Sequence, residues 1–315
     1  DAQTGAEVHT LTGHTRFINA VAYSPDGTYI ISGGDDQTVR IWNAQSGAEM
    51  LRKPSGHTGS VSSVAYSPDG AYITSGSDDQ TVRVWDAKTG DEVLQLTGHR
   101  EHINAIAYSP DGKSIVSSSD DQTVRVWDAQ TGAEVLQLAG HIGPVKAVTY
   151  SPDGTYVVSG GDDQMVRIWE AQTGAEVLQL AGHTSPVNAV ACSSDGAHIV
   201  SGSADQTVRM WDAQTGAEVL QLARHTEPVY AVAYSPDGAH IVSGSADHTV
   251  RVWDAQTGAE VLQLIGHTEA INAVAYSPDG AHFVSGSAGG TVRVWDAQTG
   301  AEVLQLARHT EPVYA

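Results

Sequence analysis

The sequence predicts an all-β protein built as a closed ring of seven four-stranded antiparallel blades. The main observation is a set of seven tryptophans at a nearly fixed interval, 43 residues once and 42 residues five times: Trp42, Trp85, Trp127, Trp169, Trp211, Trp253 and Trp295. The copies are also close in sequence, because the run at 212–222 recurs at 128–138, 254–264 and 296–306. A fixed period of this length indicates one supersecondary unit repeated in series. No segment has a sustained 3.6-residue apolar period, so no helix is expected.

Each copy contains four short runs that are typical of β-strands. In the copy that spans 183–222, these apolar or β-branched runs lie at 187–191, 198–202, 207–212 and 217–222. Glycine, proline, aspartate and serine bound the runs, as expected for strands joined by tight turns. One four-stranded meander cannot bury both of its apolar faces alone. Copies stacked radially bury each other's faces and hide most strand edges.

The repeats predict a single domain over residues 1–315. Its blade cores are expected at approximately 13–52, 56–96, 98–138, 140–180, 182–222, 224–264 and 266–306, and 307–315 begins an eighth repeat. Because the first residues already follow the repeat pattern, we expect the chain to be a piece of a longer protein.

Two segments compete for the outer strand of the seventh blade, residues 7–11 and residues 302–306. A short connecting turn lowers the loop-closure cost for 302–306, and Leu304 offers more apolar surface than His9. We therefore expect the C-terminal segment to form this strand. The other segment would then leave the ring or pair with a second molecule, which allows a strand-exchanged dimer.

The ends of each copy carry a family resemblance. A Gly-His pair opens the copy, as at Gly182-His183, and a Trp-Asp pair closes its third run, as at Trp211-Asp212. This histidine and this tryptophan recur seven times at locked spacing, and the pattern resembles the WD40-repeat (WD-repeat) β-propeller family over essentially the whole chain. The resemblance implies a seven-bladed WD40 β-propeller in which, by family habit, an N-terminal strand completes the last blade. The near-identical Val-Ala-Tyr-Ser-Pro-Asp-Gly and Asp-Ala-Gln-Thr-Gly repeats are similar to C-terminal sensor arrays of fungal NACHT-type (NLR-like, heterokaryon-incompatibility) proteins, and also to cyanobacterial arrays.

Each copy repeats a histidine, a serine, an aspartate and a tryptophan at fixed offsets. Serine, histidine and aspartate are also the residues of a hydrolase triad. An enzyme rarely needs six identical active sites, so we assign these residues a structural role and assign no catalytic residue. The WD40 resemblance implies a hydrogen-bonded network from Trp to Ser, from Ser to His and from His to Asp. The complete sets are His14, Ser32, Asp36, Trp42; His57, Ser75, Asp79, Trp85; His99, Ser117, Asp121, Trp127; His141, Ser159, Asp163, Trp169; His183, Ser201, Asp205, Trp211; and His225, Ser243, Asp247, Trp253.

The seventh copy departs from this pattern. It keeps His267, Ser285 and Trp295, but Gly289 stands in place of the aspartate and Gly290 follows it. We expect His267 to lose its charged acceptor. Because two glycines also loosen a turn, we expect this blade to be the weakest of the seven.

Composition and charge exclude several classes of function. The formal net charge is −21, and seven of the sixteen basic residues are arginines two residues before each tryptophan. No basic stripe remains for phosphates, so nucleic-acid binding is not expected. The single cysteine, Cys192, excludes a disulfide framework and suits a reducing, cytoplasmic compartment. No apolar stretch is long enough to cross a membrane. We expect no cofactor and no metal, because His198, His240 and His282 occupy one equivalent position in adjacent blades and lie too far apart to share an ion.

The copies differ mainly at positions two, three and five after the repeated histidine. The residue just before the aspartate of the repeated His-Ser-Asp-Trp set also divides the copies. It is aspartate in copies 1–4 and alanine in copies 5–7. The resemblance implies that both sets lie on one face, around the mouth of the central channel. Phe17 is expected to be an exposed aromatic hot spot, or alternatively to cap the packing of the first blade. The expected partner-binding residues are Arg16, Phe17, Asn19, Asp35, Asp78, Glu101, His102, Asp120, Lys146, Asp162, Glu227, Tyr230 and Glu269.

A constant scaffold with variable positions on one face is what a recognition surface requires. Our first hypothesis is a non-catalytic protein–protein interaction scaffold or sensor platform, with a protein or peptide as its partner, in a larger regulatory protein. The second is a structural spacer or oligomerisation module on which the variation is incidental. An enzyme is not expected, because no unrepeated nucleophile or acid/base cluster is present.

Overall fold

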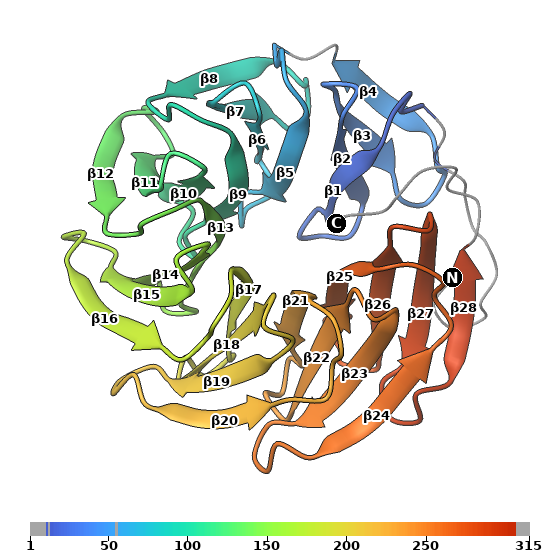
Figure 1. The fold of residues 1–315 in the computed structure, drawn as a ribbon. Helices are drawn as coiled ribbons and strands as arrows, with labels where there is room; N and C mark the ends of the chain where they lie inside the picture. Colours follow the sequence, from blue (N-terminus) through green and yellow to red (C-terminus); the bar gives the residue numbers. More distant parts are fainter. Residues whose placement is uncertain (1–10, 12, 54–55, 307–315) are drawn as a thin grey trace.

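The computed structural model of the chain describes residues 11, 13–53 and 56–306. Its described residues form 28 β-strands in seven four-stranded antiparallel sheets, and none of them is helical. Figure 1 shows the sheets as blades around a common centre, with the first strand of each blade innermost and the fourth outermost. The structure is therefore a seven-bladed β-propeller with four antiparallel strands per blade, as the sequence predicts.

The strand bounds repeat from blade to blade. The inner strands are β1 (Ile18–Tyr23), β5 (Val61–Tyr66), β9 (Ile103–Tyr108), β13 (Val145–Tyr150), β17 (Val187–Cys192), β21 (Val229–Tyr234) and β25 (Ile271–Tyr276). The second strands are β2 (Tyr29–Gly34), β6 (Tyr72–Ser77), β10 (Ser114–Ser119), β14 (Tyr156–Gly161), β18 (His198–Ser203), β22 (His240–Ser245) and β26 (His282–Ser287). The third strands are β3 (Val39–Asn43), β7 (Thr81–Asp86), β11 (Thr123–Asp128), β15 (Met165–Glu170), β19 (Val208–Asp212), β23 (Thr249–Asp254) and β27 (Thr291–Asp296). The outer strands are β4 (Glu49–Lys53), β8 (Glu92–Thr97), β12 (Glu134–Ala139), β16 (Glu176–Ala181), β20 (Glu218–Leu222), β24 (Glu260–Ile265) and β28 (Glu302–Leu306).

The outer strand of blade 7 comes from the C-terminal segment. β28 pairs antiparallel with β27, with Trp295 opposite Glu302 and Val292 opposite Leu306. The sequence-based preference for 302–306 is therefore confirmed. Residues 7–10 of the competing segment lie outside the described residues.

The turn between the first and second strands is fixed by its aspartate. In blade 4, Asp153 accepts hydrogen bonds from the Ser151 hydroxyl at 2.6 Å and from the Thr155 amide at 3.0 Å. Gly154 follows at a φ of +73°, a conformation that costs glycine little because it has no Cβ atom. Such an aspartate-centred turn makes the reversal at this end of each blade rigid.

Neighbouring blades pack through one apolar cluster at each interface. Between blades 4 and 5, Val158 and Ile168 meet Val187, Ile199 and Trp211. Six such clusters in the described residues join blade 1 to blade 2 and so on to blade 7. The seven tryptophans are 1% to 5% exposed. Six of them each lie in the apolar cluster of one interface: Trp85, Trp127, Trp169, Trp211, Trp253 and Trp295. Burial on this scale supplies most of the stability of an array whose single blades would not be stable alone.

Apolar side chains between blades 7 and 1 are more exposed than their equivalents at the other six interfaces. Val284 of blade 7 is 38% exposed, whereas its equivalent Val242 in blade 6 is 0% exposed. Tyr23 of blade 1 is 64% exposed, whereas its equivalent Tyr150 in blade 4 is 7% exposed. No apolar cluster of the described residues joins these two blades. We call Val21, Tyr23 and Val284 the seam.

Candidate functional site

The two sets of variable positions form one surface. In blade 1 the Asp35 amide donates to the Phe17 carbonyl at 2.8 Å, and in blade 3 the Asp120 amide donates to the His102 carbonyl at 2.9 Å. Blades 5–7 repeat this bond with alanine as the donor. In every blade, therefore, the residue three positions after the repeated histidine lies beside the aspartate or alanine that donates this amide bond. We call this surface the rim: Arg16, Phe17, Asn19, Asp35, Asp78, Glu101, His102, Asp120, Lys146, Asp162, Glu227, Tyr230 and Glu269.

Exposure divides the rim residues into two groups. The exposed members are Arg16, Glu101, His102, Glu227, Tyr230 and Glu269, and the others are half-buried. Phe17 belongs to the half-buried group, contrary to the expectation of an exposed aromatic ring. Tyr230, which is 39% exposed, is the exposed aromatic side chain of the rim.

Asparagines of the rim also hold neighbouring blades together. The Asn19 side-chain amide donates to Asp35 Oδ1 at 2.7 Å and to the carbonyl of Val61, at the start of the next inner strand, at 3.1 Å. Asn104 makes the same pair of bonds, to Asp120 Oδ1 at 2.8 Å and to the next blade at 2.9 Å. These amide donors are already used within the propeller, so both side chains have a structural role.

Blades 1–4 give the rim an acidic half. Lys146 Nζ lies 3.0 Å from Asp120 Oδ1, and hydrogen bonds from Asn104 and Lys146 outweigh the effect of burial, so the pKa of Asp120 is lowered. Asp78 differs, because the basic side chain beside it is that of His102, whose Nδ1 lies 3.8 Å from Asp78 Oδ1. Burial first, and then the negative charges of Asp35 and Asp120, raise the pKa of Asp78 despite the His102 charge. An additional cation placed beside Asp78 would relieve this repulsion.

The other half of the rim is less charged at its turns. Ala204, Ala246 and Ala288 stand where blades 1–4 have aspartate. Pro186 and Pro228 precede the inner strands here, and Tyr230 projects from β21. The rim thus combines a carboxylate-rich half with a half that offers an aromatic ring and small apolar groups.

The repeated histidine, serine, aspartate and tryptophan lie within hydrogen-bonding distance in each of blades 1–6. In blade 5 the Trp211 Nε1–H group donates to Ser201 Oγ at 2.8 Å, His183 Nε2 lies 2.8 Å from the same oxygen, and His183 Nδ1 lies 2.8 Å from Asp205 Oδ2. The other five sets repeat these contacts at 2.7 Å to 2.9 Å. Ser201 is 0% exposed, so its oxygen cannot reach a substrate as a nucleophile would have to.

Hydrogen bonds hold these aspartates ionised. Burial raises the pKa of Asp205, but bonds from His183 and Thr207 outweigh it and hold the pKa far below its usual value. The threonine two residues after the aspartate was missed in the sequence, although its constant spacing is a signal for it: Thr207 Oγ1 donates to Asp205 Oδ1 at 2.6 Å. In blade 4, Met165 takes this position, and there the pKa of Asp163 is lowered to about 2.

Blade 7 replaces the charged acceptor with a hydroxyl. His267 Nδ1 lies 2.7 Å from Thr291 Oγ1, and His267 Nε2 lies 2.7 Å from Ser285 Oγ. Burial, and then the charge of Arg293, lower the pKa of His267 to about 4. The expectation that Gly290 loosens this turn needs correction. Gly290 has a φ of +69°, and its equivalent in blade 6, His248, has nearly the same φ of +66°. Glycine adopts this conformation with less strain than other residues.

Seven segments of the chain match the family described as WD domain, G-beta repeat: residues 5–43, 48–86, 90–128, 132–170, 174–212, 216–254 and 258–296. The chain belongs to the WD40 family. Because the segments cover most of the chain, the membership applies to the whole array and not to a single repeat.

Three relatives each match this chain over about the length of one repeat. Protein Mut11 of Chlamydomonas reinhardtii is 48% identical over 42 residues, which are 13% of this chain and 11% of that protein. Nuclear distribution protein PAC1 of Arthroderma benhamiae is 49% identical over 43 residues, 14% of this chain and 9% of that protein. An uncharacterized WD repeat-containing protein of Synechocystis is 52% identical over 44 residues, 14% of this chain and 13% of that protein. The matched segments thus span only about a tenth of each relative.

The arginines of the WD40 scaffold are paired within their own blades. Arg40 Nη1 lies 2.8 Å from Glu49 Oε1, and the arginine of every other blade pairs with the glutamate nine residues later. These arginines are 1% to 9% exposed, so they add no basic surface to the propeller. The described residues contain no group of three or more His, Cys, Asp or Glu side chains that could hold a metal ion. No helix in the same part of the chain is long and apolar enough to cross a membrane.

Proposed function

We propose that the rim is a recognition surface for a protein or peptide and that the chain is a non-catalytic scaffold or sensor platform. The observation that carries the proposal is the location of the variation, since the copies differ on the rim while the Ala-Gln-Thr-Gly loops of the opposite face hardly vary. Family membership supports it as well, because WD40 propellers generally bind proteins or peptides.

The charges of the rim define the chemistry of its partner. The negative charges of Asp35 and Asp120 act on Asp78, and among the described residues no lysine or arginine forms an ion pair with Asp78. A lysine or arginine of the partner would bind there, and an apolar or aromatic side chain would pack against Tyr230. The formal net charge of −21 would attract such a basic segment over longer distances.

The wider context of the platform is part of the same proposal. Near-identical repeats suit the sensor end of a larger signalling protein, for which fungal NACHT-type (NLR-like) proteins are one candidate. The relatives include both a fungal and a cyanobacterial protein, and so do not discriminate between these sources. A single cysteine supports a reducing, cytoplasmic location.

Peptides selected from a random library on the immobilised protein would test the rim directly. The affinity of a selected peptide is measured for the native protein and for the double variant Asp35→Asn/Asp78→Asn. Removing two partly exposed carboxylates should weaken binding by about 5-fold to 30-fold, or ~1–2 kcal/mol. The matched control is Asp86→Asn/Asp128→Asn, which removes two charges from the opposite face. Equal loss in both variants, or loss only in the control, contradicts the proposal.

The seam favours one alternative, a structural spacer or oligomerisation module. Tyr23, Val21 and Val284 are exposed apolar side chains that a second copy could cover. Sedimentation of the native protein and of Tyr23→Arg separates the two functions. A dimer that Tyr23→Arg dissociates favours the oligomerisation module, whereas a native monomer with rim-dependent peptide binding favours recognition.

A further inference from the structure

One position of the inner strands differs in a single blade. The last residue of the inner strand is tyrosine in six blades, at Tyr23, Tyr66, Tyr108, Tyr150, Tyr234 and Tyr276, and cysteine in blade 5, at Cys192. Apart from Tyr23 at the seam, these rings are packed against the preceding blade. Tyr150, for example, is 7% exposed, and burial raises its pKa to about 12. Cys192 therefore leaves the space of an aromatic ring unfilled.

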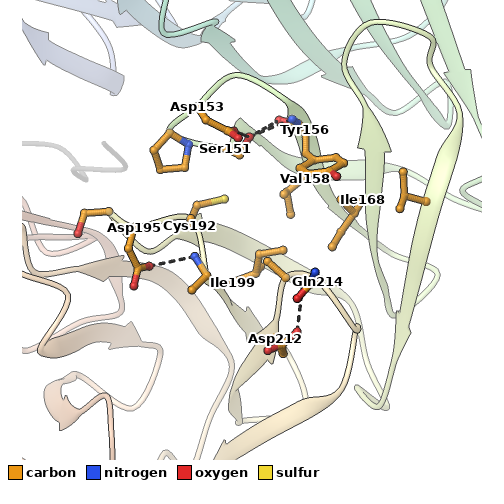
Figure 2. A pocket seen from close by; sticks show the side chains of 16 residues that line it. Ser151, Asp153, Tyr156, Val158, Ile168, Cys192, Asp195, Ile199, Asp212 and Gln214 are labelled. Carbon is orange, nitrogen blue, oxygen red and sulfur yellow. Dashed lines mark hydrogen bonds between the residues drawn. The ribbon is translucent and has the colours of Figure 1, made fainter.

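A cavity of about 630 Å³ occupies this place between blades 4 and 5. Figure 2 shows Cys192 near Val158 and Ile168 of blade 4 and Ile199 of blade 5, which form apolar walls. The equivalent cavity between blades 1 and 2 keeps its tyrosine, Tyr66, and measures about 340 Å³. The cavity that lacks the tyrosine is thus nearly twice as large.

A second departure from the repeat lines the same cavity. The turn after Cys192 reads Ser193-Ser194-Asp195-Gly196, whereas the other six blades have proline where blade 5 has Ser194. Ser194 lines the cavity together with Cys192. Burial, and then the charge of Asp153, raise the pKa of Cys192 to about 12. The thiol is therefore neutral at physiological pH and acts as part of the apolar wall.

Three carboxylates add a negative potential. Asp153, Asp195 and Asp212 all line the cavity, and no lysine or arginine does (Figure 2). Asp153 and Asp195 accept hydrogen bonds within their own turns, from Ser151 and Ser193, which lower their pKa values and keep them ionised. A ligand that fits this site would thus carry an aromatic ring, which packs against the apolar walls, and a cationic group, which the carboxylates attract.

We propose that the cavity between blades 4 and 5 binds an aromatic ring that carries a cationic group, as in an arylalkylamine or in a tyrosine flanked by lysine. The ring takes the place that tyrosine holds in the other blades, and the cation faces Asp153, Asp195 and Asp212. The site lies at the end of the strands opposite to the rim, because β17 begins at Val187, beside the Pro186–Ala204 contact that is equivalent to the rim contacts of blades 1 and 3, and ends at Cys192, before the turn that lines the cavity. It is therefore independent of the rim.

Calorimetric titration with tyramine tests the proposal, with 4-hydroxyphenylacetate as the probe of opposite charge. Tyramine should bind the native protein saturably, and 4-hydroxyphenylacetate at least about tenfold more weakly. The variant Cys192→Tyr restores the residue of the other blades and should weaken tyramine binding at least about tenfold without lowering the melting temperature. The matched variant Cys192→Ala keeps the cavity and should bind within about threefold of the native protein.

A capped Lys-Tyr-Lys peptide distinguishes the two sources of the ligand. Tighter binding of the peptide than of tyramine assigns the site to a partner's side chain, and the reverse order assigns it to a free amine. No saturable binding of either probe to the native protein, or equal tyramine binding by Cys192→Tyr, overturns the proposal.

Discussion

Restoring the missing aspartate of blade 7 should stabilise the propeller. In Gly289→Asp, the new carboxylate would accept bonds from His267, from Thr291 and from the backbone, as Asp247 does from His225, Thr249 and the Thr226 amide in blade 6. The backbone permits the change, because Gly289 is not at a positive φ. The added Cβ would lie 3.2 Å from Cγ of Glu269, an exposed and flexible side chain that can move aside.

The expected gain follows from these bonds. A net hydrogen bond to a charged group contributes about 1.5–3 kcal/mol, and replacing glycine lowers the entropy of the unfolded chain by about 0.4–1 kcal/mol. Desolvation of the new carboxylate offsets part of this. We expect Gly289→Asp to raise the free energy of unfolding by about 1–3 kcal/mol. The assay is urea unfolding followed by tryptophan fluorescence.

The pH dependence of the same variant provides an independent check. The pKa of His267 is lowered from 6.5 to about 4 in the folded state, so only the unfolded state binds the proton between these values. The native protein should therefore lose stability as the pH falls from about 6.5 to 4, by up to about 3 kcal/mol for this 6%-exposed side chain. A carboxylate beside His267 favours its protonated form, so Gly289→Asp should reduce this loss.

The matched variant Asp247→Gly makes blade 6 resemble blade 7. It should lower the free energy of unfolding by a similar amount, about 1–3 kcal/mol, and add acid sensitivity below pH 6.5. The reasoning is refuted if Gly289→Asp leaves the stability at neutral pH unchanged or lower while Asp247→Gly is harmless. In that case the aspartate would add nothing to the network.

Three further outcomes are expected. Asp205→Ala should lower the free energy of unfolding by about 1–3 kcal/mol, because it leaves the buried His183 Nδ1–H group without its acceptor; an unchanged urea midpoint would argue against this. Alanine at Arg16, Phe17 and Tyr230 should weaken a bound partner by about 1–4 kcal/mol for each true hot spot. The melting temperature should change least for the exposed Tyr230, and a matching drop in stability there would point to a packing role instead. Deleting residues 1–12 should change the urea midpoint little, because β28 already completes blade 7, and a loss of several kcal/mol would identify the N-terminal segment as a clasp.

The sequence predicts the repeated features of this fold because each depends on residues inside one copy. The spacing of Trp211 and His183 is enough to place the four strands and the network that links them. Features that depend on two blades are harder to predict. The bond from Asn19 to the carbonyl of Val61 and the exposure of Tyr23 at the seam follow from how whole blades are placed, which no single repeat encodes.

The rim and the cavity were accessible to sequence reasoning to different degrees. Comparison of the copies identified the rim positions, but not that Phe17 is half-buried, because the depth of a side chain depends on its neighbours. The cavity had a signal in the sequence, since Cys192 replaces a repeated tyrosine and Ser194 a repeated proline. What the sequence lacks is the geometry that brings both beside Val158 of the preceding blade.

The central claim is that recognition takes place on the rim, and hydrogen–deuterium exchange of a peptide complex tests it most directly. Amide exchange is compared between the free protein and the protein saturated with a selected peptide. We predict protection in the rim segments 15–20, 35–37, 77–80, 101–104 and 227–231, and no change in the opposite loops 43–47, 86–90 and 128–132. Protection confined to those opposite loops, with the rim unchanged, would contradict the account.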